Sequence, residues 1–149
     1  MAVLNQSSVT NNVKLIDARG PRFSAVITTL VLAAALVTQS AALIAIQLVV
    51  FAIGAFAGPA KTPYAFLFKK FVKPRLKGEV PVEDARPPQF AQSVGLIFAV
   101  VALAGSLLSI PALFTVAVGF ALFAAFLNAA FNFCLGCEIY LIAIRIIKK

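Results

Sequence analysis

Two long stretches without a charged residue most constrain the fold of this chain. They run from Phe23 to Ala57 and from Phe90 to Phe133. The first alone would form about 50 Å of helix at about 1.5 Å per residue, whereas the hydrocarbon core of a bilayer is about 30 Å thick. Each stretch is therefore expected to cross a membrane twice.

Polar residues near the middle of each stretch indicate where it turns. Thr38, Gln39 and Ser40 interrupt the first stretch, and the second contains Ser106 to Pro111, in which a proline prevents an uninterrupted helix. The predicted transmembrane helices cover residues 23–37, 41–57, 91–107 and 112–133. The prediction is an all-α, polytopic membrane protein with one membrane domain over residues 23–149 and an N-terminal tail at 1–22.

The composition agrees with a membrane protein. Hydrophobic residues make up 62% of the 149 residues and charged residues 12%, whereas charged residues are about a quarter of a typical soluble domain. The chain has no histidine, so the commonest general base and metal ligand is absent.

Two amphipathic segments follow the predicted hairpins. In residues 63–76 the aromatic and aliphatic side chains recur at helical spacing and the lysines fall on the opposite face, as in a helix lying at the membrane interface. In residues 138–149 the charges occupy one narrow stripe, which predicts a second interfacial helix. The proline-rich remainder of the segment up to residue 90 is expected to be an extended loop.

The two halves of the chain resemble each other. Asp17-Ala18-Arg19 recurs 67 residues later as Asp84-Ala85-Arg86, and each copy precedes a predicted hairpin and an amphipathic segment. Because each half has an even number of spans, the halves share one orientation and form a parallel repeat about an axis near the membrane normal. This alignment places the chain's two cysteines near residues 66–71 of the first half.

The distribution of basic residues predicts the orientation. All 13 Lys and Arg residues lie in the two tails or in residues 60–90, and none lies in the turns near Gln39 and Ser109. The positive-inside rule therefore places both termini and the long loop of this multi-pass protein in the cytoplasm. The net charge of +8 indicates contact with anionic lipid headgroups and no nucleic-acid binding.

Both cysteines lie in Cys134-Leu135-Gly136-Cys137, at the predicted cytoplasmic end of the fourth span. Two cysteines at this spacing can act as attacking and resolving thiols, and we expect Cys134 to attack and Cys137 to resolve. Gly136 would let the backbone turn sharply. Asn132 could orient the thiolate.

Glu138 follows the motif directly and could accept a proton or pair with Arg145.

Alternatives to a reactive dithiol remain. Two soft ligands cannot complete a tetrahedral zinc site, so no metal is expected unless a dimer or a partner supplies the other ligands. The cysteines could also be small apolar residues that pack at a helix end. No cofactor is predicted, and whether a ligand or lipid binds between the halves is left open.

The segment Phe133-Cys134-Leu135-Gly136-Cys137-Glu138-Ile139-Tyr140, together with the four spans and the Asp-Ala-Arg segments, resembles the bacterial membrane family catalogued as domain of unknown function 4395. The resemblance covers the chain from about Val13 onward, and it implies a location in the bacterial cytoplasmic (inner) membrane. Members of this family are often encoded near thioredoxin-like proteins and rhodanese-type sulfurtransferases, which implies a role in thiol or sulfur handling. Cys134, Gly136, Cys137, Glu138 and Tyr140 match the motif that would carry this role.

The resulting hypothesis is a cytoplasm-facing dithiol that exchanges electrons or sulfur with a soluble thioredoxin-like or sulfurtransferase partner. One alternative is a non-catalytic membrane anchor or accessory subunit, and another is a transporter of small sulfur compounds; a homo-oligomer is compatible with each. Quinone-linked disulfide-forming enzymes also carry Cys-x-x-Cys at a helix end, but their dithiol faces the oxidising side and a second cysteine pair relays electrons. Oxidative protein folding is therefore not expected.

Overall fold

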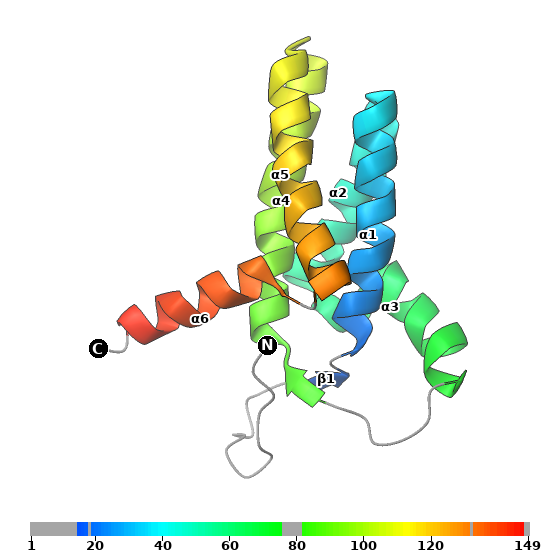
Figure 1. The fold of residues 1–149 in the computed structure, drawn as a ribbon, viewed down its shortest axis with the longest axis vertical. Helices are drawn as coiled ribbons and strands as arrows, with labels where there is room; N and C mark the ends of the chain where they lie inside the picture. Colours follow the sequence, from blue (N-terminus) through cyan, green and yellow to red (C-terminus); the bar gives the residue numbers. More distant parts are fainter. Residues whose placement is uncertain (1–14, 18, 76–81, 132, 148–149) are drawn as a thin grey trace.

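The computed structural model describes residues 15–17, 19–75, 82–131 and 133–147. Two helical hairpins, α1–α2 and α4–α5, stand side by side, and the predicted all-α fold of a polytopic membrane protein is confirmed (Figure 1). The elements in chain order are β1 (Leu15–Asp17), α1 (Arg19–Thr38), α2 (Ala41–Phe56), η2 (Pro59–Lys61), α3 (Pro63–Leu67), η3 (Phe68–Val72), η4 (Lys73–Arg75), β2 (Val82–Asp84), α4 (Arg86–Leu107), α5 (Pro111–Phe131) and α6 (Leu135–Ile147).

Three of the described helices, α1, α4 and α5, are long and apolar enough to cross a membrane. The fourth, α2, has 16 residues and therefore measures about 24 Å, somewhat less than the hydrocarbon core. Large apolar side chains cover the outside of the bundle, among them Leu30, Ile97 and Phe123. Small side chains such as Ala35 and Ala102 are fully buried between the helices. Large residues outside and small ones inside are typical of helices packed in lipid.

Several elements begin earlier than the sequence predicts. Helix α1 begins at Arg19, inside the expected N-terminal tail, and α6 begins at Leu135, before residue 138. Helix α4 begins at Arg86, although Pro87 and Pro88 follow at once. Prolines are tolerated there because the first N–H groups of a helix have no intrahelical acceptor. The expected loop before residue 90 also contains the strand β2.

The turns at the far end of the hairpins have the same backbone structure. Gln39 and Ser109 each adopt a left-handed conformation, with φ of 54° and 58°. The next residue in each turn closes the same kind of hydrogen bond: Ser40 N–H donates to the Ala35 carbonyl (3.2 Å) and Ile110 N–H to the Gly105 carbonyl (2.8 Å). This correspondence supports the predicted internal repeat.

The two strands join the halves of the chain. β1 and β2 are antiparallel, and Ile16 pairs with Glu83, the residue at the equivalent place before the second Asp-Ala-Arg segment. Pairing between equivalent residues is what a two-fold axis through the strand pair produces. The segments that follow the hairpins, α3 with η3 and α6, extend to opposite sides of the bundle, in keeping with such an axis (Figure 1).

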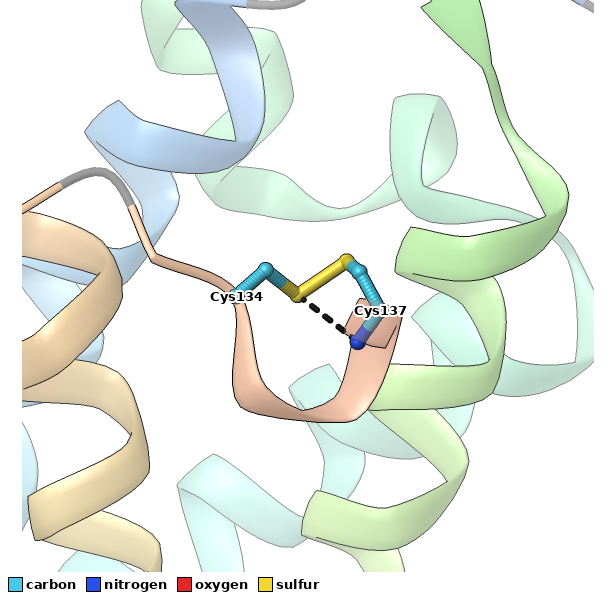
Figure 2. Close-up of a disulfide and its surroundings, with 2 residues drawn as sticks. All are labelled: Cys134 and Cys137. Carbon is cyan, nitrogen blue, oxygen red and sulfur yellow. Dashed lines mark hydrogen bonds between the residues drawn. A yellow bond between two sulfur atoms is a disulfide. The ribbon is translucent and has the colours of Figure 1, made fainter. Parts of the chain in front are cut away.

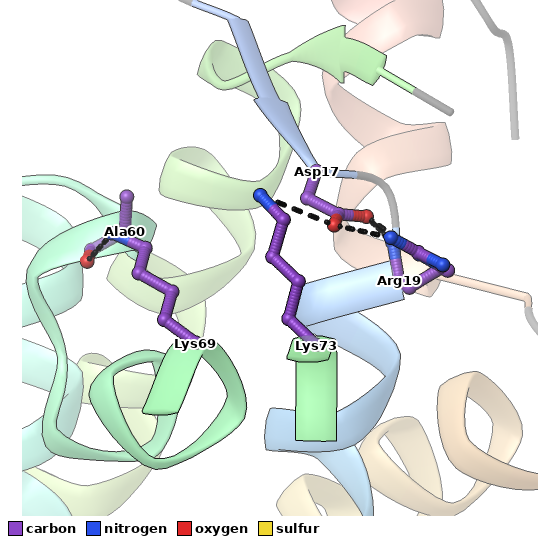
Figure 3. A network of polar contacts seen from close by, with 5 residues as sticks. All are labelled: Asp17, Arg19, Ala60, Lys69 and Lys73. Carbon is purple, nitrogen blue, oxygen red and sulfur yellow. Dashed lines mark hydrogen bonds and ion pairs between the residues drawn. The ribbon is translucent and has the colours of Figure 1, made fainter. Parts of the chain in front are cut away.

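Asp17, at the end of β1, links this strand to α1 and to η4 (Figure 3). Its carboxylate accepts hydrogen bonds from the Arg19 backbone N–H (3.0 Å) and the Arg19 guanidinium (2.9 Å), and Lys73 Nζ lies 3.7 Å away. Burial alone would raise the pKa of Asp17, but the hydrogen bonds from Arg19 and the charges of Arg19 and Lys73 outweigh it, so the pKa is lowered.

The lowered pKa of Asp17 predicts acid sensitivity. A carboxylate of this kind stabilises the fold above its ordinary pKa of 3.8, and the stabilisation is lost as the pH falls through the folded-state value. Asp17→Asn should therefore unfold at a lower temperature than the wild type at pH 7, and the gap should close in a pH series continued below 3.8. Thermal unfolding in detergent measures this difference in unfolding temperature. A difference that does not change with pH would contradict the lowered pKa of Asp17.

A buried polar chain connects the first hairpin to α3. The Tyr64 hydroxyl donates to Gln47 Oε1 (2.8 Å), and Gln47 Nε2 lies 3.5 Å from Thr28 Oγ1. Gln47 is fully buried, and burial raises the pKa of Tyr64. The chain fixes the start of α3 against α1 and α2.

Removing the Tyr64 hydroxyl is expected to destabilise this junction. Tyr64→Phe leaves the buried Gln47 oxygen without its donor, which costs about 1–3 kcal/mol. Tyr140→Phe is the matched control, because the Tyr140 hydroxyl makes no hydrogen bond within the described residues. Denaturant unfolding in detergent should separate the two variants, and equal stabilities would mean that the Tyr64 hydrogen bond contributes nothing.

Candidate functional site

The cysteine motif forms the start of α6. Helix α5 ends at Phe131 and α6 begins at Leu135, with Phe133 and Cys134 in the connection. Cys134 and Cys137 are joined by a disulfide (Figure 2). The predicted supporting residue Asn132 lies outside the described residues.

Cys134 occupies the position of a helix N-cap. The Cys137 backbone N–H donates to Cys134 Sγ (3.1 Å; Figure 2). The Glu138 N–H donates to the Cys134 carbonyl (3.0 Å) as the first helical hydrogen bond. A capping side chain makes this same contact with the third residue of a helix. The motif is therefore at the N-terminus of the 13-residue α6, and not at the end of the fourth span as predicted.

The first half has a hydroxyl cap at the equivalent place. Thr62 Oγ1 accepts from the Ala65 N–H (3.1 Å), and the Phe66 N–H donates to the Thr62 carbonyl (3.1 Å). Thr62 and Ala65 thus correspond to Cys134 and Cys137. The predicted correspondence with residues 66–71 is wrong by a few residues, because both helices of the second hairpin are longer: α4 has 22 residues against 20 in α1, and α5 has 21 against 16 in α2. The dithiol is a feature of the second half alone.

The aromatic contacts agree with this correspondence. Phe68 packs against Phe23 on α1 with ring centroids 5.6 Å apart, and Tyr140 packs against Phe90 on α4 at 5.5 Å. Tyr140 therefore holds α6 against the bundle. Glu138 lies in the first turn of α6, where a negative charge stabilises a helix. Among the described side chains it forms no ion pair with Arg145.

Gly136 brings α6 close to α4. A Cβ atom at this position would lie 2.7 Å from both Cα and Cβ of Ala91, closer than carbon atoms can pack. Gly136 was predicted to supply a sharp turn, but it lies inside the first helical turn and its role is this close approach. Both cysteines are buried beside it, Cys134 with 6% and Cys137 with 1% of its surface exposed.

The disulfide lies on the wall of a cavity of about 310 Å³. Helices α1, α4, α5 and α6 form most of the lining, which is largely apolar. In the first half Tyr64 reaches from the start of α3 toward α2. Gly136, at the equivalent position, places no side chain between the helices, and the cavity is found there. Sequence reasoning missed this cavity.

Two amides in the cavity lining have an unused acceptor. Gln92 Oε1 and Asn128 Oδ1 are buried and accept no hydrogen bond from the described part of the chain. Gln92 lies on α4 and Asn128 on α5. Buried amide oxygens usually have a donor, so these two atoms mark the polar part of an otherwise apolar cavity.

The arrangement can support thiol chemistry. The N-terminus of a helix favours negative charge, which stabilises a thiolate on Cys134 once the disulfide is reduced. Within the described residues no group of three or more His, Cys, Asp and Glu side chains gathers to hold a metal ion.

The fold and the site together define a polytopic, all-helical membrane protein with a disulfide-forming Cys-x-x-Cys at the start of a peripheral helix. The chain belongs to the family described as Domain of unknown function (DUF4395), which it matches over residues 16–145. The match includes both hairpins and the cysteine motif. No curated protein and no solved structure shows significant similarity to the chain.

Proposed function

We propose that this protein exchanges two electrons with a soluble, cytoplasmic thiol partner through Cys134 and Cys137. The observation that carries the proposal is the position of the disulfide in the first turn of α6, with Cys137 N–H hydrogen-bonded to Cys134 Sγ. Thiol exchange proteins use this combination, because the helix N-terminus stabilises the thiolate that attacks or leaves.

The exchange proceeds in two balanced steps. A thiolate of the partner attacks Cys134 Sγ, the Cys134–Cys137 bond breaks, and Cys137 leaves as a thiolate. The second thiol of the partner then attacks the mixed disulfide, forming the partner's own disulfide and releasing Cys134 as a thiolate. A thioredoxin-like protein is a partner of the required kind.

A persulfide-carrying sulfurtransferase can use the same pair after reduction. The Cys134 thiolate takes the outer sulfur from the partner's persulfide and becomes a persulfide itself, and the partner keeps a thiolate. Cys137 then attacks the inner sulfur, which restores the disulfide and releases hydrosulfide. Both routes need the two cysteines in the same compartment as the partner.

Thiol trapping of the purified protein in lipid nanodiscs tests the exchange. Incubation with a reduced thioredoxin-type protein, followed by a maleimide that adds mass, should show both cysteines becoming modified while the partner's disulfide forms. A persulfide donor offered to the reduced protein should add sulfur to Cys134, visible by mass spectrometry. A pair that reacts with neither reagent would favour a membrane anchor over an exchange protein.

The proposed orientation places both termini and the start of α6 in the cytoplasm. It rests on the basic residues, which avoid the exposed turns at Gln39 and Ser109. In a variant without Cys134 and Cys137, a cysteine at position 39 or 109 should react with an impermeant maleimide added outside intact bacteria. A cysteine introduced at Lys69 should react only after the cells are opened. The reverse pattern would mean that the dithiol faces the outside of the cell.

A further inference from the structure

We infer that the cavity beside Cys134 and Cys137 binds the ring of a lipid-soluble quinone, which exchanges two electrons with the cysteine pair. This inference rests on the proposed thiol exchange and adds a second, membrane-borne partner. It assigns the protein a position between soluble thiols and the quinones of the bilayer.

The position of the two cysteines on the cavity wall allows a second partner to approach them from the membrane. Cys134 and Cys137 are both buried, and both line the 310 Å³ cavity. Phe120, Phe123 and Ile139 also line it, and 59%, 57% and 46% of their surfaces are exposed. Because such apolar surfaces on a membrane helix face lipid, the cavity opens toward the bilayer. A molecule dissolved in lipid can therefore enter the cavity whose wall includes the disulfide.

The size and polarity of the cavity fit a quinone ring better than an acyl chain. The volume is at the lower end of the range for small-molecule sites, about 300–1,000 Å³, so it suits a ring whose isoprenoid tail stays in the lipid. Gln92 Oε1 and Asn128 Oδ1 both lack a donor within the described residues. A quinol supplies two hydroxyl donors, whereas an acyl chain supplies none.

Carboxamides suit a ligand that changes its oxidation state. An amide accepts a hydrogen bond through its oxygen and donates through its nitrogen. Once their side chains turn toward the cavity, Gln92 and Asn128 can therefore accept from quinol hydroxyls and, after half a turn of the amide, donate to quinone carbonyls. Both oxidation states are then held without a charged side chain in the membrane.

The reaction balances in electrons and protons. The Cys134 thiolate and the Cys137 thiol form the disulfide, losing two electrons and one proton, and the quinone gains two electrons and two protons to become a quinol. The second proton comes from water. Gln92 also lines a second cavity of about 220 Å³, and Asp17, Lys69 and Lys73 line that cavity too. Gln92 therefore lies between the quinone-ring site and these charged side chains.

The test uses reduced, full-length protein in nanodiscs with decylubiquinone as the probe. One quinol should form for every two thiols lost, followed by quinone absorbance and by maleimide gel shift. Gln92→Leu and Asn128→Leu should each raise the half-saturating quinone concentration about 3- to 10-fold, the loss expected for one hydrogen bond. Gln39→Leu, which changes an exposed amide in the far turn, should leave that concentration unchanged.

The outcomes separate the quinone inference from the proposed thiol exchange. Protein that exchanges with a thioredoxin-type partner but does not reduce decylubiquinone would overturn the quinone inference alone. Protein inert to both would overturn both proposals. Equal half-saturation in the wild type and both leucine variants would mean that quinone reacts without occupying the cavity, and this too would overturn the inference. A photoreactive azidoquinone should label α4, α5 or α6, and decylubiquinone should compete with it.

Discussion

Replacing Cys137 with serine is expected to leave the protein covalently joined to its thiol partner, whereas replacing Cys134 is expected to prevent this linkage. Cys134 caps α6 and is the more exposed of the two cysteines, 6% against 1%. A partner's thiol therefore forms its mixed disulfide with Cys134, and without Cys137 nothing inside the chain resolves it. We expect the Cys134→Ser variant to exchange roughly 100-fold more slowly or not at all.

Non-reducing gels and mass spectrometry of acid-quenched cells measure this difference. The trapped species should be abundant in the Cys137→Ser variant and should disappear when dithiothreitol is added. The double serine variant is the control for unrelated adducts. Trapping through Cys137 in the Cys134→Ser variant, at a level equal to the reverse case, would show that the two cysteines have no fixed order.

Gly136→Ala is expected to loosen α6 from the bundle and to expose the cysteine pair. The added Cβ would lie 2.7 Å from Cα and Cβ of Ala91, and these backbone-linked atoms of α4 cannot move aside as the end of a flexible side chain can. Forcing an extra carbon into such a contact costs about 1–3 kcal/mol. The least costly response is for the start of α6 to move away from α4, which uncovers Cys134.

Gly119→Ala is the matched control on α5. A Cβ at Gly119 meets nothing within 4 Å, so this variant should keep the stability and thiol reactivity of the wild type. After reduction, the Gly136→Ala protein should react with a water-soluble maleimide several-fold faster than either the wild type or the control. Unchanged reactivity together with unchanged thermal stability would mean that the Gly136–Ala91 contact does not hold α6 in place.

The membrane fold was predictable because its cause is local in the sequence. Two stretches without charge, each interrupted near its middle, leave few alternatives to two hairpins, and the breaks at Gln39 and Ser109 coincide with the observed turns. The beginning of α4 was not predictable from proline content, because prolines in the first helical turn and prolines in a loop have the same local pattern. The pairing of β1 with β2 depends on contacts between segments far apart in sequence.

The candidate site was predictable only in part. The spacing of Cys134 and Cys137 identified a dithiol, but the motif gave no indication that it begins a helix, since cysteine is rarely a capping residue. The signal that could have placed it was the alignment of Thr62 with Cys134, visible once the halves are matched by their interfacial helices. The cavity could not be found this way, because helices α1, α4, α5 and α6 and the absence of a side chain at Gly136 create it.

The strand pair has a consequence for the origin of the chain. In the ribbon of β1 and β2, Ile16 lies opposite its own counterpart Glu83, so a half-length ancestor with one strand could form the same ribbon with a second copy of itself. Two such copies would assemble as a symmetric dimer with identical caps at both peripheral helices. A fusion of two such copies would free one cap to become a dithiol while the other kept its hydroxyl, and asymmetry of function could then arise without loss of the shared scaffold.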